Sequence, residues 1–424
     1  MIRWDSKLRQ TELWDSPLQR SANYPVRINL FETSLEGHRA RYLREIICGL
    51  KEQQPDCELR LCIFKRHRES LEYLEFLKPL EDSFRIAPLP ERLLSGFLWS
   101  DIRRLGLLRD CLRANPCDRL IIPYGDGIVP LMGGLPRWII RRIVPSATRM
   151  QTMLFRPTWV YESQRWTKRL YHQLRRWGVC RWPGWRIHYS DYNAWDRAQR
   201  KVDRYRATEI SLVPEFFDPW DLKSKSDAIQ WLLSHGYLSD LSAKRAASRP
   251  LISLPGFPEH RKGAVELIEA FVQDKGLEGG LLLWGPVPRN VQQILKAKGI
   301  PWQEDPRILM VEKYIDSAAF EALFSAIDLV VLPYQFHLGG VSSLYLLSVI
   351  HRKSTLCDQR AWLGWATQKY QHGKAIDCSD PSNIHRELSS WISGEAIRQA
   401  TPQAAEQLRS ECTQERFRSI WASR

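Results

Sequence analysis

Two glycines and two serines stand between two apolar runs in residues 327–348, IDLVVLPYQFHLGGVSSLYLLS. The first run predicts a buried strand, and the second run predicts a helix. The first amides of a helix are unpaired donors at the positive end of its dipole, so they attract anions. Glycine lets a phosphate approach the backbone, and serine adds a hydroxyl donor. We therefore predict a diphosphate site formed by Gly339, Gly340, Val341, Ser342 and Ser343.

A cationic loop stands at an equivalent position earlier in the chain, in SLPGFPEHRKGAVELIEAF. A strand ends at Gly256, and a helix opens after Arg261, Lys262 and Gly263. Cations at a helix start oppose the helix dipole, so they need another reason to be there. A Lys or Arg in this loop can neutralise a leaving diphosphate. The alternatives are a solvated charge in this loop and, for the first site, a plain glycine turn with a serine helix cap.

Five further residues are candidates for contacts with a ligand. Gly37 and His38 follow a predicted strand, and Asp126 stands between two glycines at the end of another. His337 and Tyr345 flank the glycine pair. For Asp126 the alternative is a turn aspartate, for His38 a histidine at a helix start, and for Tyr345 a core position.

Strand and helix patterns alternate over both halves of the chain. In the first half, strands are expected at 26–31, 57–64 and 118–124, with helices over 39–53, around 69–78 and over 100–114. Such alternation is typical of a parallel sheet flanked by helices.

In the second half, the series continues from residue 249 and ends in the glycine-rich loop. Strands are expected at 249–256, 279–286, 307–315 and 328–333, and the helices between them at 260–274, 291–299 and 318–327.

A Pro- and Asp-rich stretch, 209–226, separates the two halves and is typical of a hinge. The expected fold is α/β, with two Rossmann-like domains facing across a cleft, because open parallel sheets bind ligands at the carboxyl ends of their strands. The expected division is an N-terminal extension (1–24), a first domain (25–215), a second domain (216–395) and a helical segment that could cross back to the first domain (396–424).

The positive charge of the chain is concentrated in one stretch. The formal charge is +14, and residues 137–206 alone hold 17 Lys and Arg against four acids, with seven of the 18 tryptophans. Within it, residues 159–186 include a basic amphipathic helix that could lie on an anionic membrane surface. The alternative is a surface helix that packs its Trp stripe on the sheet. A nucleic-acid-binding role is disfavoured because no zinc pattern or RNA-binding strand motif accompanies the charge.

The location of the protein is predicted from its cysteines and apolar segments. The nine cysteines are scattered without a C-x-x-C pair, which favours a reducing cytoplasm. We expect no secretory signal and no membrane span, because the start of the chain is polar and no window approaches 20 apolar residues.

The second half resembles the donor-binding domain of GT-B glycosyltransferases of the family 4 (group 1) type. The resemblance follows the "KG" helix, LLLWGP, VEKYI, AIDLVVLP, the glycine-rich turn and DPSNIHREL. The family motif G-R-x-x-x-x-K-G is matched at Gly256, Lys262 and Gly263, but Phe257 replaces its arginine. The two glutamates of the family fall on His337 and Tyr345, so both carboxylates are missing.

The resemblance implies transfer of a sugar from a nucleoside-diphosphate sugar to a glycan or lipid-linked acceptor, with retention of configuration. It implies no metal ion and no cofactor beyond the donor. The catalytic residues would be Lys262, Arg261, His337 and Asp126, and the donor-binding residues would be Gly37, His38, Gly256, Gly339, Gly340, Val341, Ser342, Ser343 and Tyr345. The alternatives are an inactive GT-B-like binding protein, because the carboxylates are missing, and a nucleotide-sugar epimerase.

Overall fold

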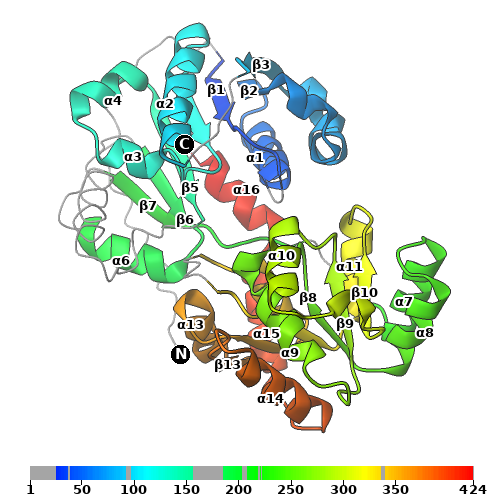
Figure 1. Cartoon of the computed structure of the whole chain (residues 1–424). Coiled ribbons are helices and arrows are strands. Elements are labelled where there is room, and N and C mark those ends of the chain that lie inside the picture. The colour runs from blue at the N-terminus through cyan, green and yellow to red at the C-terminus, as the bar shows by residue number, and fades with distance from the viewer. Residues whose placement is uncertain are drawn as a thin grey trace.

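The computed structural model describes residues 25–36, 39–91, 97–155, 185–202, 208–217, 220, 222–335 and 340–423. These residues form two parallel β-sheets, one in each half of the chain, flanked by helices (Figure 1). The α/β prediction with two Rossmann-like domains is confirmed.

The first sheet has seven strands among the described residues, in the order β3-β2-β1-β4-β5-β6-β7. Its strands are β1 (Arg27–Phe31), β2 (Glu58–Phe64), β3 (Arg85–Leu89), β4 (Arg119–Ile122), β5 (Arg149–Leu154), β6 (Trp185–Tyr189) and β7 (Thr208–Leu212). The helices of this domain are α1 (Arg39–Gln53), α2 (Phe97–Ala114), α3 (Val129–Gly133), α4 (Arg137–Ile143) and α6 (Tyr192–Val202).

The second sheet has six strands among the described residues, in the order β10-β9-β8-β11-β12-β13. Its strands are β8 (Leu251–Leu254), β9 (Gly280–Trp284), β10 (Ile308–Val311), β11 (Leu329–Leu332), β12 (Ser354–Asp358) and β13 (Lys374–Ile376). Its helices are α7 (Lys225–Ser234), α8 (Asp240–Ser248), α9 (Ala264–Val272), α10 (Arg289–Ala297), α11 (Ser317–Ala326), α12 (Ser343–Ile350), α13 (Ala361–Tyr370) and α14 (Pro381–Ile392). Two short helical turns, η5 (His260–Lys262) and η6 (Trp302–Glu304), lie in its loops.

Each sheet reverses its direction of growth at one point. In the first sheet β1 pairs with both β2 and β4, and in the second β8 pairs with both β9 and β11. At such a reversal the loops after the two adjacent strands diverge to opposite faces and leave a crevice at the carboxyl ends of the strands. The loops after β1, β4, β8 and β11 are therefore the places where a ligand is expected.

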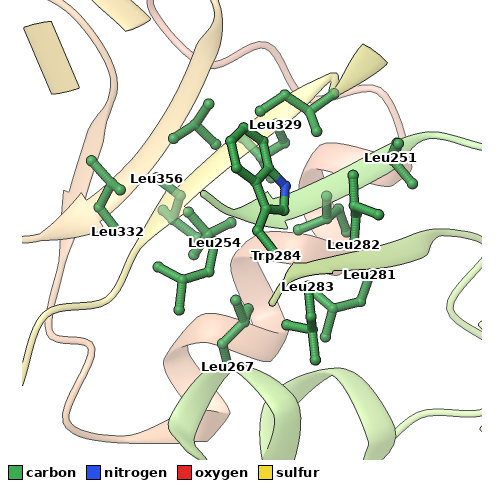
Figure 2. Close-up of a cluster of buried hydrophobic side chains, with 14 of the residues drawn as sticks. Leu251, Leu254, Leu267, Leu281, Leu282, Leu283, Trp284, Leu329, Leu332 and Leu356 are labelled. Carbon is green, nitrogen blue, oxygen red and sulfur yellow. The ribbon is translucent and has the colours of Figure 1, made fainter. Parts of the chain in front are cut away.

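The core of the second domain is built from leucines of neighbouring strands around Trp284 (Figure 2). β9 and β11 are continuous apolar runs, because strands of a parallel sheet are covered by helices on both faces. Leu281, Leu282 and Leu283 are fully buried, and Leu267 of α9 packs onto the same cluster. This packing fixes the strand ends from which the loops of the second domain emerge.

The last two helices connect the domains. α15 (Pro402–Glu411) packs against α12, and α16 (Gln414–Ala422) packs against α1 of the first domain (Figure 1). A Cβ placed on Gly49 would lie 2.8 Å from Cβ of Arg418, so the two helices are in close contact there. The end of the described chain thus returns to the first domain.

The predicted helix at 69–78 is the clearest difference from expectation. That segment forms the short helical turns η1 (Lys65–Glu69), η2 (Tyr73–Leu77) and η3 (Lys78–Ser83), in place of one regular helix. Pro79 at the start of η3 has no amide hydrogen to continue a helix through this point. No helix within the described residues is long and apolar enough to cross a membrane.

Candidate functional site

A pocket of about 610 Å³ lies between the two domains. Its described lining comes from loops that follow strands of both sheets, including the four loops at the points of reversal, and from the start of α1 and α12. On the first-domain side the lining residues are Ser34, Glu36, Arg39, Tyr42, Tyr124, Phe155 and Glu215. On the second-domain side they are Phe257, Glu259, Arg261, Lys262, Tyr334, Gly340, Val341, Ser342, Ser343 and Leu344.

The loop after β8 is held against the loop after β11. Gly263 has φ +78°, and a Cβ placed on it would lie 1.9 Å from the carbonyl oxygen of Pro333, so no larger residue fits without movement. The amide of Gln335 donates to the carbonyl of Arg261 at 3.1 Å. The cationic loop and the loop that leads to the glycine pair therefore form one wall of the pocket.

Lys262 and Arg261 both line this wall, but their side chains are placed differently. A Cβ placed on Gly256 would lie 3.3 Å from Nζ of Lys262, so the amino group lies over the end of β8. The guanidinium of Arg261 forms an ion pair with Glu259. Part of the charge of Arg261 is therefore balanced within the loop.

The start of α12 lines the pocket with the N-terminus of a helix. Ser342 caps the helix by accepting a hydrogen bond from the amide of Tyr345 at 3.3 Å, and Tyr334 hydroxyl lies 3.2 Å from the same oxygen. Ser342 is therefore a helix cap, as in the simpler alternative, and it also lines the pocket. The hydroxyl of Ser343 lies close enough to the carboxyl of Glu215 to lower the pKa of that group.

The opposite wall is organised by Glu32, which directly follows β1. One oxygen of its buried carboxylate accepts from the amides of Thr33 and Ser34 and from Nη1 of Arg39 at 2.8 Å. Burial raises the pKa of Glu32, and Arg39 and the amides oppose that rise. Arg39 is held in place on its other side, with its guanidinium carbon 3.9 Å from the centre of the Tyr124 ring.

Three aromatic rings line this wall of the pocket. Phe155 stacks on Tyr42 of α1 with ring centres 4.9 Å apart, and on Tyr124 at 4.7 Å. Because each ring comes from a different segment, the stack fixes the start of α1 against the ends of β4 and β5.

Glu215 is the one buried carboxylate among the described residues that line the pocket. It lies in the hinge, three residues after the end of β7, and is 5% exposed. The Tyr42 hydroxyl donates to its carboxylate. Burial raises the pKa of Glu215 to about 7, against the lowering effect of nearby Arg41 and of Ser343.

Seven residues of the predicted site lie in the pocket lining or directly beneath it. Arg261, Lys262, Gly340, Val341, Ser342 and Ser343 line it, and Gly256 lies beneath Lys262. Gly37, His38, His337 and Gly339 lie outside the described residues.

Two predicted side chains are placed elsewhere. Tyr345 is fully buried in the core, and its hydroxyl donates to the carbonyl of His372 at 2.7 Å. Asp126 accepts a hydrogen bond from the amide of Phe155 at 3.0 Å and is not part of the described pocket lining. The Tyr345 side chain therefore occupies a core position, as in the simpler alternative, whereas the catalytic role of Asp126 stays a prediction.

Sequence reasoning missed Arg39, Tyr42, Tyr124 and Glu215. Their common signal is position: each lies within a few residues of a strand end or at the first turn of the helix that follows. Within the described residues, no three His, Cys, Asp or Glu side chains gather as metal ligands.

Comparison with known proteins gives matches to solved structures only. No family model matches the chain, and no curated protein matches it by sequence. Trehalose 6-phosphate synthase from Burkholderia multivorans matches with a TM-score of 0.63 at 12% identity, over 93% of this chain and 95% of that chain. Sucrose-phosphate synthase from Thermosynechococcus elongatus matches at 0.60 and 14% identity, over 93% and 94% of the two chains.

A third match is HepE from Anabaena, solved in complex with UDP and glucose. Its TM-score is 0.59 at 13% identity, and the match covers 94% of this chain and 97% of that chain. The chain has the GT-B fold, the two-domain architecture of these glycosyltransferases. At these identities the likeness establishes the fold, and the activity must be argued from the pocket.

Proposed function

We propose that the protein is a glycosyltransferase of the family 4 type that transfers a sugar from a nucleoside-diphosphate sugar to a glycan or lipid-linked acceptor. The observation that supports this most strongly is the pocket between the domains. There the loops at the reversal points of the two sheets meet, and Lys262 and the start of α12 line one wall. A cation beside unpaired helix amides suits a diphosphate. HepE, of the same fold, was solved with UDP.

In the proposed reaction, the bond between the anomeric carbon and the diphosphate breaks, and the sugar passes to an acceptor hydroxyl, whose proton goes to the departing diphosphate. Negative charge grows on the departing diphosphate. Lys262 and the amides of residues 340–343 would stabilise that charge, in a reaction that retains configuration and uses no metal ion. His337 and Asp126 stay proposed catalytic residues, and Gly339, Gly37 and His38 stay proposed contacts of the donor. Closure of the domains would exclude water and favour transfer over hydrolysis.

The proposed acceptor is presented at an anionic membrane surface, through residues 159–186, of which 159–184 lie outside the described residues, and through helix α4, which precedes them in the sequence. α4 exposes Trp138, which is 60% exposed, and Arg142 lies over its ring at 5.1 Å. Basic and aromatic side chains together suit the headgroup region of an anionic leaflet. The protein would then act in the cytoplasm at the inner face of the membrane. Co-sedimentation with anionic but not neutral vesicles, reduced in Trp138→Ala, is the expected result, and equal binding to both would contradict it.

The proposed function is tested first by binding. UDP-, ADP-, GDP- and dTDP-sugars are titrated into the wild-type protein by calorimetry, and the tightest ligand is then tested with Lys262→Ala and Gly340→Val. Both variants should bind at least about tenfold more weakly, because each disturbs the diphosphate contacts. Lys244→Ala, a change on an exposed position of α8, should bind as the wild type does. Absence of binding for every sugar nucleotide would contradict the proposal.

A second candidate is a GT-B-like protein that binds a sugar nucleotide without transferring it. The observation in its favour is that position 345, where the resemblance places a family carboxylate, holds a tyrosine buried in the core. In addition, one match is the N-terminal domain of trehalose-6-phosphate phosphatase from Candida albicans, at TM-score 0.59 and 13% identity. Release of free sugar from a bound donor would favour an enzyme, and binding without turnover for any acceptor would favour this second candidate.

A further inference from the structure

Glu215 lies where the first domain, the hinge and the start of α12 meet. Its carboxylate accepts a hydrogen bond from Tyr42 of α1 and interacts with the hydroxyl of Ser343, the first residue of α12. It therefore touches the helix start that is proposed to bind a diphosphate. No other carboxylate in the described pocket lining is buried, since Glu36 is exposed and Glu259 is only partly covered.

The groups that face Glu215 do not fully compensate a negative charge. From α1, Arg41 lies near enough to favour the ionised form, and Tyr42 donates its hydrogen bond. From the end of α15, Cys412 lies nearby, and from α12 only the neutral Ser343 approaches. Burial outweighs these effects and raises the pKa of Glu215 to about 7. A proton can therefore be gained or lost at Glu215 near neutral pH.

We propose that Glu215 is a proton-controlled positioning residue of the donor site, which must be the neutral acid for a diphosphate to occupy the start of α12. This proposal rests on the proposed function. As the carboxylate, Glu215 attracts the hydroxyl of Ser343 and places a negative charge beside the start of α12. As the acid, it can stay in the pocket wall and donate its own O–H to a phosphate oxygen.

The physical reason is the repulsion of two like charges in a shielded site. A diphosphate that reaches Ser343 must come close to Glu215, because both residues line the same pocket and Ser343 is near enough to affect the Glu215 carboxyl. Like charges this close in a poorly solvated pocket disfavour each other far more than in water. Binding above neutral pH therefore takes up one proton from solvent, which stays on Glu215, and no bond of the donor is broken in this step.

The experiment measures donor binding as a function of pH. UDP-glucose, or the sugar nucleotide that binds most tightly in the screen above, is titrated by calorimetry between about pH 6 and about pH 8.5, where its diphosphate diester keeps a constant charge. For the wild type, we expect affinity to fall roughly 10- to 30-fold over this range. Titrations near pH 8 in buffers with different ionisation enthalpies should show uptake of about one proton.

Glu215→Gln provides the decisive comparison, because it keeps the shape of the side chain and removes its charge. We expect this variant to bind with constant affinity over the range and without proton uptake. Glu36→Gln, which removes an exposed carboxylate of the same pocket, should keep the pH dependence of the wild type. A wild type and a Glu215→Gln variant with the same pH dependence would overturn the inference and leave the proposed function intact.

Tyr42→Phe is the second variant, and it is needed if Glu215→Gln does not fold. Loss of the hydroxyl donor disfavours the carboxylate, so the pH at which binding weakens should move upward. An unchanged or lowered midpoint would contradict the inference. If no sugar nucleotide binds to the wild type at any pH, the proposed function itself fails.

Discussion

The hydroxyl of Tyr42 in α1 donates a hydrogen bond to the buried carboxylate of Glu215, which lies in the hinge between the domains. Ser343 of the second domain interacts with the same carboxylate. One acidic side chain thus joins the first domain, the hinge and the start of α12. Tyr42, Glu215 and Ser343 belong to three different segments. The strength of the interactions among them therefore depends on how closely the two domains approach each other.

The first prediction concerns stability and pH. The pKa of Glu215 is raised from 4.5 to about 7 by burial, so the unfolded chain releases this proton at lower pH than the folded chain. The cost of burying the charge is absent below about pH 4.5, grows as pH rises, and is fully present above about pH 7. Glu215→Gln removes this cost, so the variant should gain stability over the wild type as pH rises, on the order of 3 kcal/mol above neutral pH. Urea unfolding at several pH values measures the difference, and a difference independent of pH would contradict the assignment.

The second prediction concerns Gly263. Gly263→Ala should cost about 1–2 kcal/mol for the left-handed backbone, and a further 1–3 kcal/mol or so because the new Cβ meets the carbonyl of Pro333. Gly299 also has a left-handed backbone, with φ +68°, but a Cβ there meets nothing within 4 Å. Gly299→Ala is therefore the matched control and should show the backbone cost alone. Thermal unfolding compares the two, and equal losses would show that the loops can separate without cost.

Most of the second domain could be predicted from sequence because each of its elements has one strong pattern. Within the predicted strand 328–333, the four residues after Asp328 are apolar, and β11 forms at Leu329–Leu332 with every residue buried. The placing of the cationic loop beside the glycine-rich loop also follows, since β8 and β11 are neighbours at the reversal of the sheet.

The first-domain wall of the pocket could not be predicted in the same way. Glu215 is a single polar residue between apolar ones, and nothing local shows that Tyr42, 173 residues away, will cover it. Tyr345 was predicted to contact the donor, but it lies in the core. The sequence could not decide between the two, because the hydroxyl of a tyrosine on an apolar helix can bind either a ligand or a buried group. Its partner, the carbonyl of His372, is fixed only by the tertiary structure.

The third prediction separates the two cations of the loop after β8. Lys262→Ala should weaken sugar-nucleotide binding by about 10- to 100-fold, the range expected for one lost charge-assisted hydrogen bond. Arg261 forms an ion pair with Glu259 and is partly exposed. The double variant Arg261→Ala, Glu259→Gln should therefore change the affinity for the sugar nucleotide by less than about fivefold. Calorimetric titration of the single and double variants tests the assignment. A larger loss in the double variant than in Lys262→Ala would make Arg261 the main diphosphate contact.

The fourth prediction concerns the return of the chain to the first domain. Nε of Arg418 in α16 lies 2.7 Å from Oε2 of Glu45 in α1, whose side chain is fully buried. Arg418→Met would leave that carboxylate without its main partner, which should cost about 3–5 kcal/mol, nearer the lower value because Nε of Arg44 remains 3.5 Å from the other oxygen.

Glu45→Gln combined with Arg418→Met removes the unpaired charge and should recover much of that loss, because the cost comes from the buried carboxylate more than from the lost attraction. A double-mutant cycle by urea unfolding measures the recovery. Arg418 also contacts the exposed Glu52 at 2.6 Å, and Glu52→Gln alone should change stability by less than about 1 kcal/mol. If Glu45→Gln restored nothing, the stability of the junction would have to come from the close packing of α16 on Gly49, and Gly49→Ala would then be the more damaging change.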